Sequence, residues 1–367
     1  MGGMRILIIG FQPYENITYP HLKQVVQHFT AFGSDYALFR ERGYFIDEAF
    51  KPGLSLKALL RSAYTFSTIA IDSIKLIARR LLTQYDLVIA VDNFAFITAS
   101  TLYTNVILWS HDFVTDDQER SSAWIHKLIK SKLSEKLNRK ANIIIQDQTR
   151  LSLFCSRYHP EGLYTSNVFF LPVSLRASDN YLESKLQQTP VLLQIGGINC
   201  WRSMSDKLLC HYQSHSREYA LAFHGFIDKE MQQKIRNAEH LPWTSSIDLD
   251  ANCVNKIVSK CDIGFVAYNA GDFNFYYIGR ASGQLVEFLR CGKPVIALGK
   301  TDLQRLVDEK KIGVAINHID DLDAAIAKVL FNYPTYSSNC KKLYDEVYNL
   351  NNYLDHLTDW VIERAVL

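Results

Sequence analysis

The amino-acid sequence predicts an α/β protein built from two successive parallel-sheet units. Two observations carry this prediction. Short, strongly apolar runs alternate with segments of helical periodicity along the chain, a pattern typical of a parallel sheet covered by helices on both faces. The chain also has 367 residues, more than one ordinary hydrophobic core accommodates, so two domains are expected.

The first half contains a series of runs that read as buried strands. These expected strands occupy residues 5–10, 35–40, 86–91, 105–110, 142–147 and 168–174. Residues 55–82 place apolar side chains at helical spacing. Residues 93–110 carry no charge over nearly the length of a membrane span, but Asn, Ser and Thr dilute the run. We interpret this run as a helix followed by a strand.

The pattern restarts after a polar linker at residues 176–190. The expected strands beyond it occupy residues 191–197, 219–225, 262–268, 294–299 and 312–317, with helical segments between them. Residues 335–367 look helical. Ligands of such folds bind at the carboxyl ends of the strands, so ligand space is expected between the strand ends of the two units.

Composition argues against several classes of protein. The formal net charge of +2 gives no strong bias toward nucleic acid, and no nucleic-acid partner is expected. The 7 cysteines are scattered and form no C-x-x-C, which favours reduced thiols over a disulfide framework or a zinc site. The opening MGGMRILIIG enters a strand directly, without the features of a signal peptide. We therefore expect a cytoplasmic protein.

A glycine pair stands where the strand at 191–197 passes into a helix. Gly196 and Gly197 have no side chains, so a ligand can approach the backbone closely there. Arg202 follows six residues after Gly196, and a guanidinium at this point can hold a diphosphate through two oxygens. A tight turn and a solvated arginine are the alternative, and these residues alone do not decide between the two.

The segment SGQLVEFLRCGKPVIALG combines a helix start, a carboxylate and a helix stop. The helix begins at Ser282 or Gly283, where unpaired N–H groups and the helix dipole favour an anion. Glu287 lies about one turn further on, and its carboxylate can accept hydrogen bonds from the two vicinal hydroxyls of a ribose. The alternative is a surface carboxylate on an amphipathic helix.

These segments together resemble the retaining GT-B glycosyltransferases of the large family 4 type, which includes many enzymes of cell-surface polysaccharide synthesis. That family shows P-x-K-L-x-E-(Y/F)-x-x-x-G-K-P-V-I-A where this chain reads SGQLVEFLRCGKPVIA. The resemblance is specific around residues 262–298 and looser elsewhere. It implies two Rossmann-like domains facing each other across a cleft. The domains expected are an acceptor-side domain at 1–175, a nucleotide-sugar domain at 176–345 and a C-terminal helix at 346–367 that returns to the first domain.

The resemblance also implies roles for individual residues. Glu287 matches the glutamate that binds the nucleotide ribose, and Arg202 matches the basic residue at the donor diphosphate. Gly196 and Gly197 match the segment that passes close to the phosphates. The helix residues expected to face the donor are Gly283, Gln284, Leu285 and Val286.

The chain departs from the family pattern at several of these positions. The first of the family's two glutamates, eight residues before Glu287, is replaced by Gly279. The lysine and proline of the motif are Gln284 and Ser282, and the basic residue expected after the first glycine is Gly197. Arg280 is a candidate to supply the missing positive charge.

The first half offers candidates for the acceptor side. His111 and Asp112 follow the strand at 105–110, and the resemblance implies a histidine that faces the sugar or the acceptor. A helix cap is the alternative reading of this segment. The loop after the first strand adds Tyr14, Glu15, Asn16 and His21, each more readily explained as a bystander. His224 is interpreted as structural. Residues 120–140 form a basic amphipathic segment, which suits either a solvated outer helix or a peripheral contact with the inner face of an anionic membrane.

The function implied is transfer of a sugar from a nucleotide-diphosphate sugar, UDP- or GDP-linked, to a glycan or lipid-linked oligosaccharide, with retention at the anomeric carbon. His111, Arg202 and Glu287 are the expected catalytic residues, and no metal ligand or cofactor beyond the donor co-substrate is expected. Three alternatives are a sugar-nucleotide epimerase on the same fold, a degenerate nucleotide-binding scaffold and a dehydrogenase. The last lacks a G-x-G-x-x-G after any strand.

Overall fold

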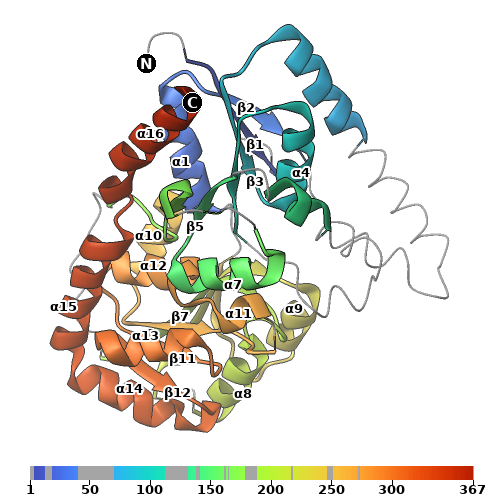
Figure 1. Cartoon of the computed structure of the whole chain (residues 1–367). Helices are drawn as coiled ribbons and strands as arrows, with labels where there is room; N and C mark the ends of the chain where they lie inside the picture. The colour runs from blue at the N-terminus through green and yellow to red at the C-terminus, as the bar shows by residue number, and fades with distance from the viewer. Residues whose placement is uncertain are drawn as a thin grey trace, which may run out of the picture. The chain divides into compact units, whose positions relative to one another are not determined.

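The computed structural model resolves the chain into two compact units (Figure 1). It describes residues 4–12, 19–39, 70–111, 131–137, 141–160, 163, 165–177, 188–215, 218–245, 251–271 and 273–366. Unit 1 comprises Met1–Leu171 and Tyr353–Leu367, and unit 2 comprises Pro172–Asn352. The chain passes from unit 1 to unit 2 between residues 171 and 172 and returns to unit 1 between residues 352 and 353. The boundaries expected from the sequence were 175 and 345. Residues 172–175 belong to unit 2 because the backbone of Leu175 bonds to Tyr348 and Leu350 there.

Unit 1 is built on a parallel sheet with strand order β2-β1-β3-β4-β5-β6. Its strands are β1 Ile6–Gly10, β2 Asp35–Leu38, β3 Leu87–Val91, β4 Val106–Trp109, β5 Asn142–Ile145 and β6 Val168–Phe170. The side chains of β1, β3 and β4 are buried throughout. Burial on both faces explains why these strands read as continuous apolar runs rather than as alternating ones.

Helices cover this sheet. The labelled helices of unit 1 are α1 Pro20–Ala31, α4 Asn93–Leu102, α7 Gln148–Tyr158 and α16 Asn351–Val366. The C-terminal helix α16 lies beside α1 (Figure 1), where His28 Nε2 and Thr358 Oγ1 are 2.9 Å apart. Arg364 at its far end donates to Asn142 Oδ1 and accepts at its carbonyl from Asn105 Nδ2. The last helix thus returns to the first unit.

Unit 2 repeats the plan with strand order β12-β11-β10-β7-β8-β9, again parallel. Its strands are β7 Val191–Ile198, β8 Ala220–Ile227, β9 Trp243–Ser245, β10 Ile263–Ala267, β11 Val295–Leu298 and β12 Gly313–Ile316. Its labelled helices are α8 Ser205–His215, α9 Lys229–Arg236, α10 Ala251–Val258, α11 Phe273–Tyr276, α12 Gly283–Arg290, α13 Asp302–Lys310, α14 Leu322–Phe331 and α15 Tyr333–Leu343.

The second sheet separates two apolar clusters. In β10, Val266 packs into the cluster with Val286 and Leu289 of α12. Its neighbours Phe265 and Ala267 belong to the other cluster, which includes side chains of α8 and α14. Successive residues of a strand point to opposite faces, so one strand supplies both cores. This double burial fixes α12 against the sheet and, through it, the position of Glu287.

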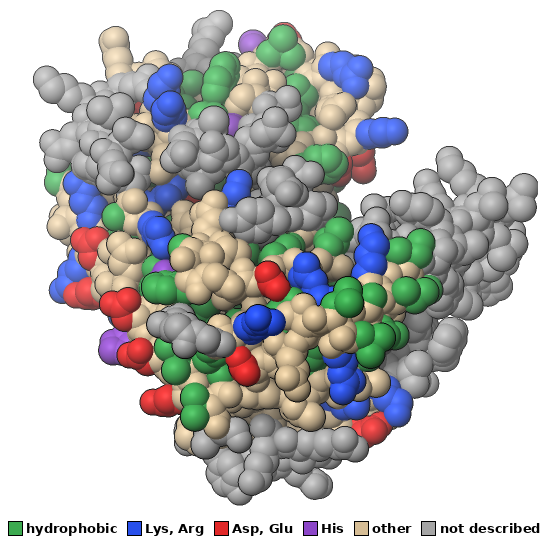
Figure 2. Space-filling view, turned by 90° about the horizontal axis from the view of Figure 1, so that it is seen from above, with side chains coloured by type: hydrophobic (Ala, Val, Ile, Leu, Met, Phe, Trp, Pro, Cys, Tyr) green, Lys and Arg blue, Asp and Glu red, His purple; other side chains and the backbone are tan. Residues whose placement is uncertain are grey.

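The structure describes part of the basic segment at 120–140 and all of the uncharged run at 93–110. Within residues 131–137 of the basic segment, Leu133 and Leu137 are buried while Lys132 and Glu135 are exposed and paired. The described part therefore behaves as an outer helix with its apolar side inward. No helix among the described residues has the length and hydropathy needed to cross a bilayer. On the face in Figure 2, basic and acidic side chains are interspersed, in keeping with the net charge of +2.

The glycine pair lies inside a strand, within the span of 191–197 expected from the sequence. β7 continues to Ile198, and Gly196 pairs in register with Gly225 of β8. The strands approach so closely that a Cβ on Gly225 would lie 1.9 Å from the carbonyl oxygen of Gly196. Gly225 also has a φ of 146°, which other residues rarely adopt. The pairing therefore requires glycine at 225.

We predict that Gly225→Ala lowers the free energy of unfolding by about 3 kcal/mol or more, because a backbone clash adds to the strain of positive φ. Gly33→Ala is the matched control, since Gly33 has a φ of 87° but nothing within 4 Å of a built Cβ. Its cost is about 1 kcal/mol. Urea unfolding of both variants measures the difference, and equal losses would contradict the close approach.

Candidate functional site

The carboxyl edge of the second sheet brings together most residues of the expected donor site. Gly196 and Gly197 lie in the last three residues of β7, and the chain then turns through Asn199 into the loop before α8. Asn199 Oδ1 accepts hydrogen bonds from the amides of Arg202 and Ser203, at 2.6 and 3.3 Å. This side-chain turn fixes the backbone of the loop, so the exposed Arg202 projects from a defined point.

Arg202 lies against the loop that follows β10. Its carbonyl oxygen accepts from the amide of Asn269 at 3.0 Å, and its guanidinium lies 5.8 Å from the centre of the Phe275 ring. The segment after β10, which contains Phe275, is thus next to the predicted phosphate-binding arginine. A cation over an aromatic face keeps its charge while it loses part of its freedom to move.

The N-terminus of α12 meets β7 directly. A Cβ built on Gly196 would lie 3.0 Å from Gln284 Nε2, so this side chain packs on the bare backbone of the glycine. Gln284 Oε1 is buried and has no hydrogen-bond partner among the described residues. The structure therefore brings Gly196 and Gln284 together, as a shared site requires.

The amides of Leu285 and Val286, which were expected to face the donor, already have acceptors at the start of the helix. Ser282 caps the helix: its Oγ accepts from the amide of Leu285 at 3.1 Å, and its carbonyl accepts from the amide of Val286 at 3.2 Å. The amides of Gly283 and Gln284, the first two of the helix, have no carbonyl acceptor within the helix. These two remain the candidates for binding an anion.

Glu287 is buried, with 4% of its surface exposed, so it is not the solvated carboxylate of the alternative interpretation. One carboxylate oxygen, Oε2, accepts from Arg290 of the same helix. The other, Oε1, is buried and has no hydrogen-bond partner among the described residues. Glu287 lies three residues after Gln284 and four after Gly283, so all three share a face of α12.

The ionisation of Glu287 reflects two opposing effects. Burial raises the pKa of the Glu287 carboxyl, while the neighbouring Arg290 guanidinium opposes the rise. Arg290 is itself buried, and its Nη1 donates to the carbonyl of Arg176 at 3.4 Å. A buried acceptor without a donor is costly, so the unpaired Oε1 of Glu287 indicates a position where a ligand can donate a hydrogen bond. Arg290 was not anticipated from the sequence, although its spacing of three residues from Glu287 signals an ion pair.

The structure explains why glycine stands at position 279, where the family motif has its first glutamate. Gly279 is buried, its amide donates to Asp302 Oδ1 at 2.7 Å, and a Cβ there would lie 2.9 Å from Asp302 Oδ2. A glutamate at 279 would meet this carboxylate. Asp302, which begins α13, was not singled out in the sequence.

His224 lies in β8, in agreement with the strand expected at 219–225. Its Nδ1 is 2.7 Å from Ser245 Oγ, and its ring is 1% exposed. Burial lowers the pKa of His224 to about 4, so the ring is neutral at physiological pH. These contacts agree with the structural interpretation.

In unit 1, the strand ends gather a histidine pair and a carboxylate. His111 follows β4, His21 begins α1, and their Nε2 atoms are 3.1 Å apart. His111 Nδ1 lies 3.5 Å from Asp92 Oδ1, which also accepts from the His111 amide at 2.9 Å. Asp92 has a φ of 67°, a strained conformation for a residue with a side chain. His21 therefore lies in contact with His111, while Asp92 was missed because only its position after a strand signalled it.

A buried arginine holds this cluster. Arg150 of α7, with 1% of its surface exposed, donates to the carbonyl of His111 and, through Nε, to Gln146 Oε1 at 2.9 Å. Gln146 in turn donates to the carbonyl of Ser110 at 2.9 Å. The backbone of His111 is thus fixed by charged and amide donors. Asp112, Tyr14, Glu15 and Asn16 lie outside the described residues.

Comparison with known proteins agrees with this architecture. A family model described as the Glucosyltransferase 3-like C-terminal domain matches residues 207–354. Among solved structures, Anabaena HepE in complex with UDP-glucose covers 98% of this chain and 100% of its own, at 15% identity and a TM-score of 0.70. The sucrose-phosphate synthase of Thermosynechococcus elongatus covers 98% of both chains, at 11% identity and a TM-score of 0.66.

The chain has the GT-B fold. A putative UDP-N-acetylglucosamine 2-epimerase from Listeria monocytogenes also matches, at 12% identity and a TM-score of 0.58, covering 97% of this chain and 95% of its own. No curated protein matches the chain in sequence.

We predict that acid destabilises unit 1 through His21. Burial first, and His111 second, hold the pKa of His21 well below 6.5. The unfolded chain therefore binds a proton that the folded chain does not, and stability falls as the pH drops below about 6.5, by at most about 1.4 kcal/mol per pH unit. His21→Gln should reduce this loss, measured by urea unfolding from pH 7 to 5.

Other buried histidines, such as His224, act in the same direction, so the quantity to compare is the difference between wild type and variant. Substitution of the exposed His240 by Gln is the matched control. Parallel pH profiles for wild type and His21→Gln would show that His21 does not contribute.

Proposed function

We propose that this protein transfers a sugar from a nucleotide-diphosphate sugar to a glycan or lipid-linked acceptor, with retention at the anomeric carbon. The observation that carries the proposal is the buried Oε1 of Glu287, which has no partner in the described part of the chain. It lies on the face of α12 shared with Gln284, whose side chain packs on Gly196. The helix thus combines a carboxylate that lacks a hydrogen-bond donor with an N-terminus that lies against glycine backbone.

A ribose supplies the donors that Glu287 lacks. Its two vicinal hydroxyls can both donate to one carboxylate, and such bonds to an ionised acceptor are short and strong. Burial raises the pKa of the Glu287 carboxyl, and the Arg290 guanidinium favours the charged form by opposing that rise. In this role Arg290 positions Glu287 and does not itself contact the ligand.

The diphosphate would bind one turn earlier. The amides of Gly283 and Gln284 and the positive end of the α12 dipole offer partial charge, and the Arg202 guanidinium offers a full one. As the bond from the anomeric carbon to the phosphate oxygen breaks, negative charge grows on the diphosphate, and these groups stabilise it. The acceptor oxygen bonds to the anomeric carbon, and its proton passes to the departing phosphate oxygen.

On the acceptor side, the proposal assigns His111 to the sugar or acceptor. Its Nε2 is paired with His21, and its Nδ1 faces Asp92, so its ring is fixed at the end of β4. The HepE structure contains UDP-glucose, which supports a UDP-sugar as the donor to test first. A place in cell-surface polysaccharide synthesis, at the inner face of the membrane, belongs to the same proposal.

The histidine pair also favours a second candidate, a sugar-nucleotide epimerase. That reaction needs groups that remove and return protons, and His21, His111 and Asp92 are such groups within contact of one another. An epimerase interconverts sugar nucleotides, whereas a transferase releases free nucleotide as it forms product.

The test of function is a donor screen followed by product analysis. We expect one nucleotide sugar to raise the melting temperature, since a ligand at 100 times its Kd stabilises a protein by about 2.7 kcal/mol. That donor should then yield free nucleoside diphosphate, faster with a glycan or lipid-linked acceptor. Interconversion of donors would identify the epimerase, and binding without turnover would identify a degenerate scaffold.

We predict that Glu287→Gln raises the KM for the donor by about tenfold or more, the cost of weakening one charged hydrogen-bonding group. Arg290→Lys is the matched control, because it disturbs the same buried ion pair while keeping both charges. It should leave the KM within about threefold. Steady-state kinetics of both variants, after each is shown to be folded, decide the point. An equal rise in KM for both would mean that Glu287 acts only through its ion pair.

A further inference from the structure

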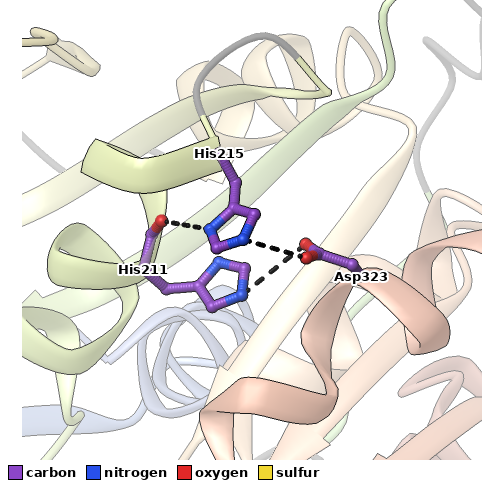
Figure 3. Close-up of side chains that lie close together, drawn as sticks. All are labelled: His211, His215 and Asp323. Atoms are coloured by element: carbon purple, nitrogen blue, oxygen red, sulfur yellow. Dashed lines mark hydrogen bonds and ion pairs between the residues drawn. The ribbon is translucent and has the colours of Figure 1, made fainter.

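A second polar cluster lies on the opposite face of the unit 2 sheet from α12. His211 and His215 stand four residues apart on α8, so they project from the same side of the helix, and Asp323 reaches them from the first turn of α14 (Figure 3). The imidazole rings are stacked with centroids 4.1 Å apart. His211 Nε2 is 3.6 Å from Asp323 Oδ1, and His215 Nε2 is 3.4 Å from Asp323 Oδ2.

In each ring, the hydrogen bond at Nδ1 determines whether Nε2 carries a proton or a lone pair. His215 Nδ1 is 2.9 Å from the carbonyl oxygen of His211, which can only accept, so Nδ1 carries the proton. His211 Nδ1 is 3.1 Å from the Tyr219 hydroxyl, which accepts a hydrogen bond when Nδ1 carries the proton. In these tautomers each Nε2 carries a lone pair, and both Nε2 atoms face the Asp323 carboxylate.

Three acceptors without a donor between them need a positive charge. A proton on His215 is one solution, and a bound cation is another. Asp320 and Glu218, the other charged groups that act on these rings, are both acidic and favour any cation at this point.

The spacing of the atoms fits a tetrahedral transition metal. Zinc ligands at 2.0–2.1 Å lie about 3.3–3.4 Å apart on a tetrahedron. His211 Nε2 and His215 Nε2 lie at 3.6 and 3.4 Å from different oxygens of Asp323, and one ligand atom from each of the three residues can be chosen so that all lie within 4.8 Å of one another, close enough to converge on one ion. Two imidazole nitrogens and one carboxylate oxygen are a donor set that zinc favours, whereas magnesium and calcium favour oxygen alone.

We propose that His211, His215 and Asp323 bind a divalent transition-metal ion of the zinc type, with a fourth position open to water. The hydrogen bonds of His215 to its own helix and of His211 to Tyr219 orient the ligands, as the partners of metal-bound histidines do. The site clamps the C-terminal end of α8 to the first turn of α14. His211 and His215 lie six and ten residues beyond Ser205, about 9 and 15 Å along α8 from its start after the loop of Arg202. The metal therefore stabilises unit 2 and takes no part in sugar transfer.

The experiment is a titration of Zn²⁺ into the full-length, tag-free protein after treatment with a chelator. We expect one equivalent to bind by calorimetry, and saturating Zn²⁺ to raise the melting temperature by about 5 °C or more. Mg²⁺ at the same concentration should have no effect. Co²⁺ should bind with the strong visible absorption of a tetrahedral site.

His215→Ala and Asp323→Asn should each weaken Zn²⁺ binding by about 100-fold or more, because each removes a direct ligand. Both positions are partly exposed, so these variants should fold. His240→Ala, at an exposed histidine outside the cluster, is the matched control and should bind as wild type does. Absence of stoichiometric binding, or equal binding by wild type and both ligand variants, would overturn the proposal and leave the cluster as an ion pair.

Discussion

The geometry of the second unit depends on the close approach of three backbone segments at Gly196. Gly225 of β8 presses against its carbonyl oxygen on one side, and Gln284 of α12 packs on its Cα on another. Side chains at either glycine would force the strands or the helix apart. Because α12 is held this way, Gln284 in its first turn lies against bare backbone rather than against a side chain.

Each unit contains a buried arginine whose guanidinium holds one polar group of the candidate site in place. Arg150 holds the carbonyl of His111 in unit 1, and Arg290 holds the carboxylate of Glu287 in unit 2. Buried charges are stable only where hydrogen bonds replace water, so each arginine constrains its partner to one geometry. The incomplete bonding of Glu287 then stands out, because its other oxygen has no such replacement within the described residues.

Much of the fold followed from the sequence because buried parallel strands are continuous apolar runs. β9, Trp243–Ser245, escaped because it is a short edge strand with exposed side chains and no such run. The helix of Glu287 was also predicted, since its N-terminal serine, its period and its glycine stop are local signals. Its cap carried a further consequence that was overlooked: a serine that caps Leu285 removes that amide from ligand binding.

Contacts between distant residues could not be predicted in the same way. His21 and His111 are 90 residues apart in the chain, and His211 and Asp323 are brought together from separate helices. Periodicity assigns residues to faces but does not say which faces meet. The burial of Glu287 is likewise a property of the packed unit, because the sequence alone allowed a solvated carboxylate at the same place.

The return of α16 to unit 1 makes that unit discontinuous in the chain, with the whole of unit 2 inserted before its last helix. Leu354, Leu357 and Val361 of this helix are buried. During synthesis residues 353–367 are made only after the whole of unit 2, so the core of unit 1 cannot be completed until unit 2 has been translated.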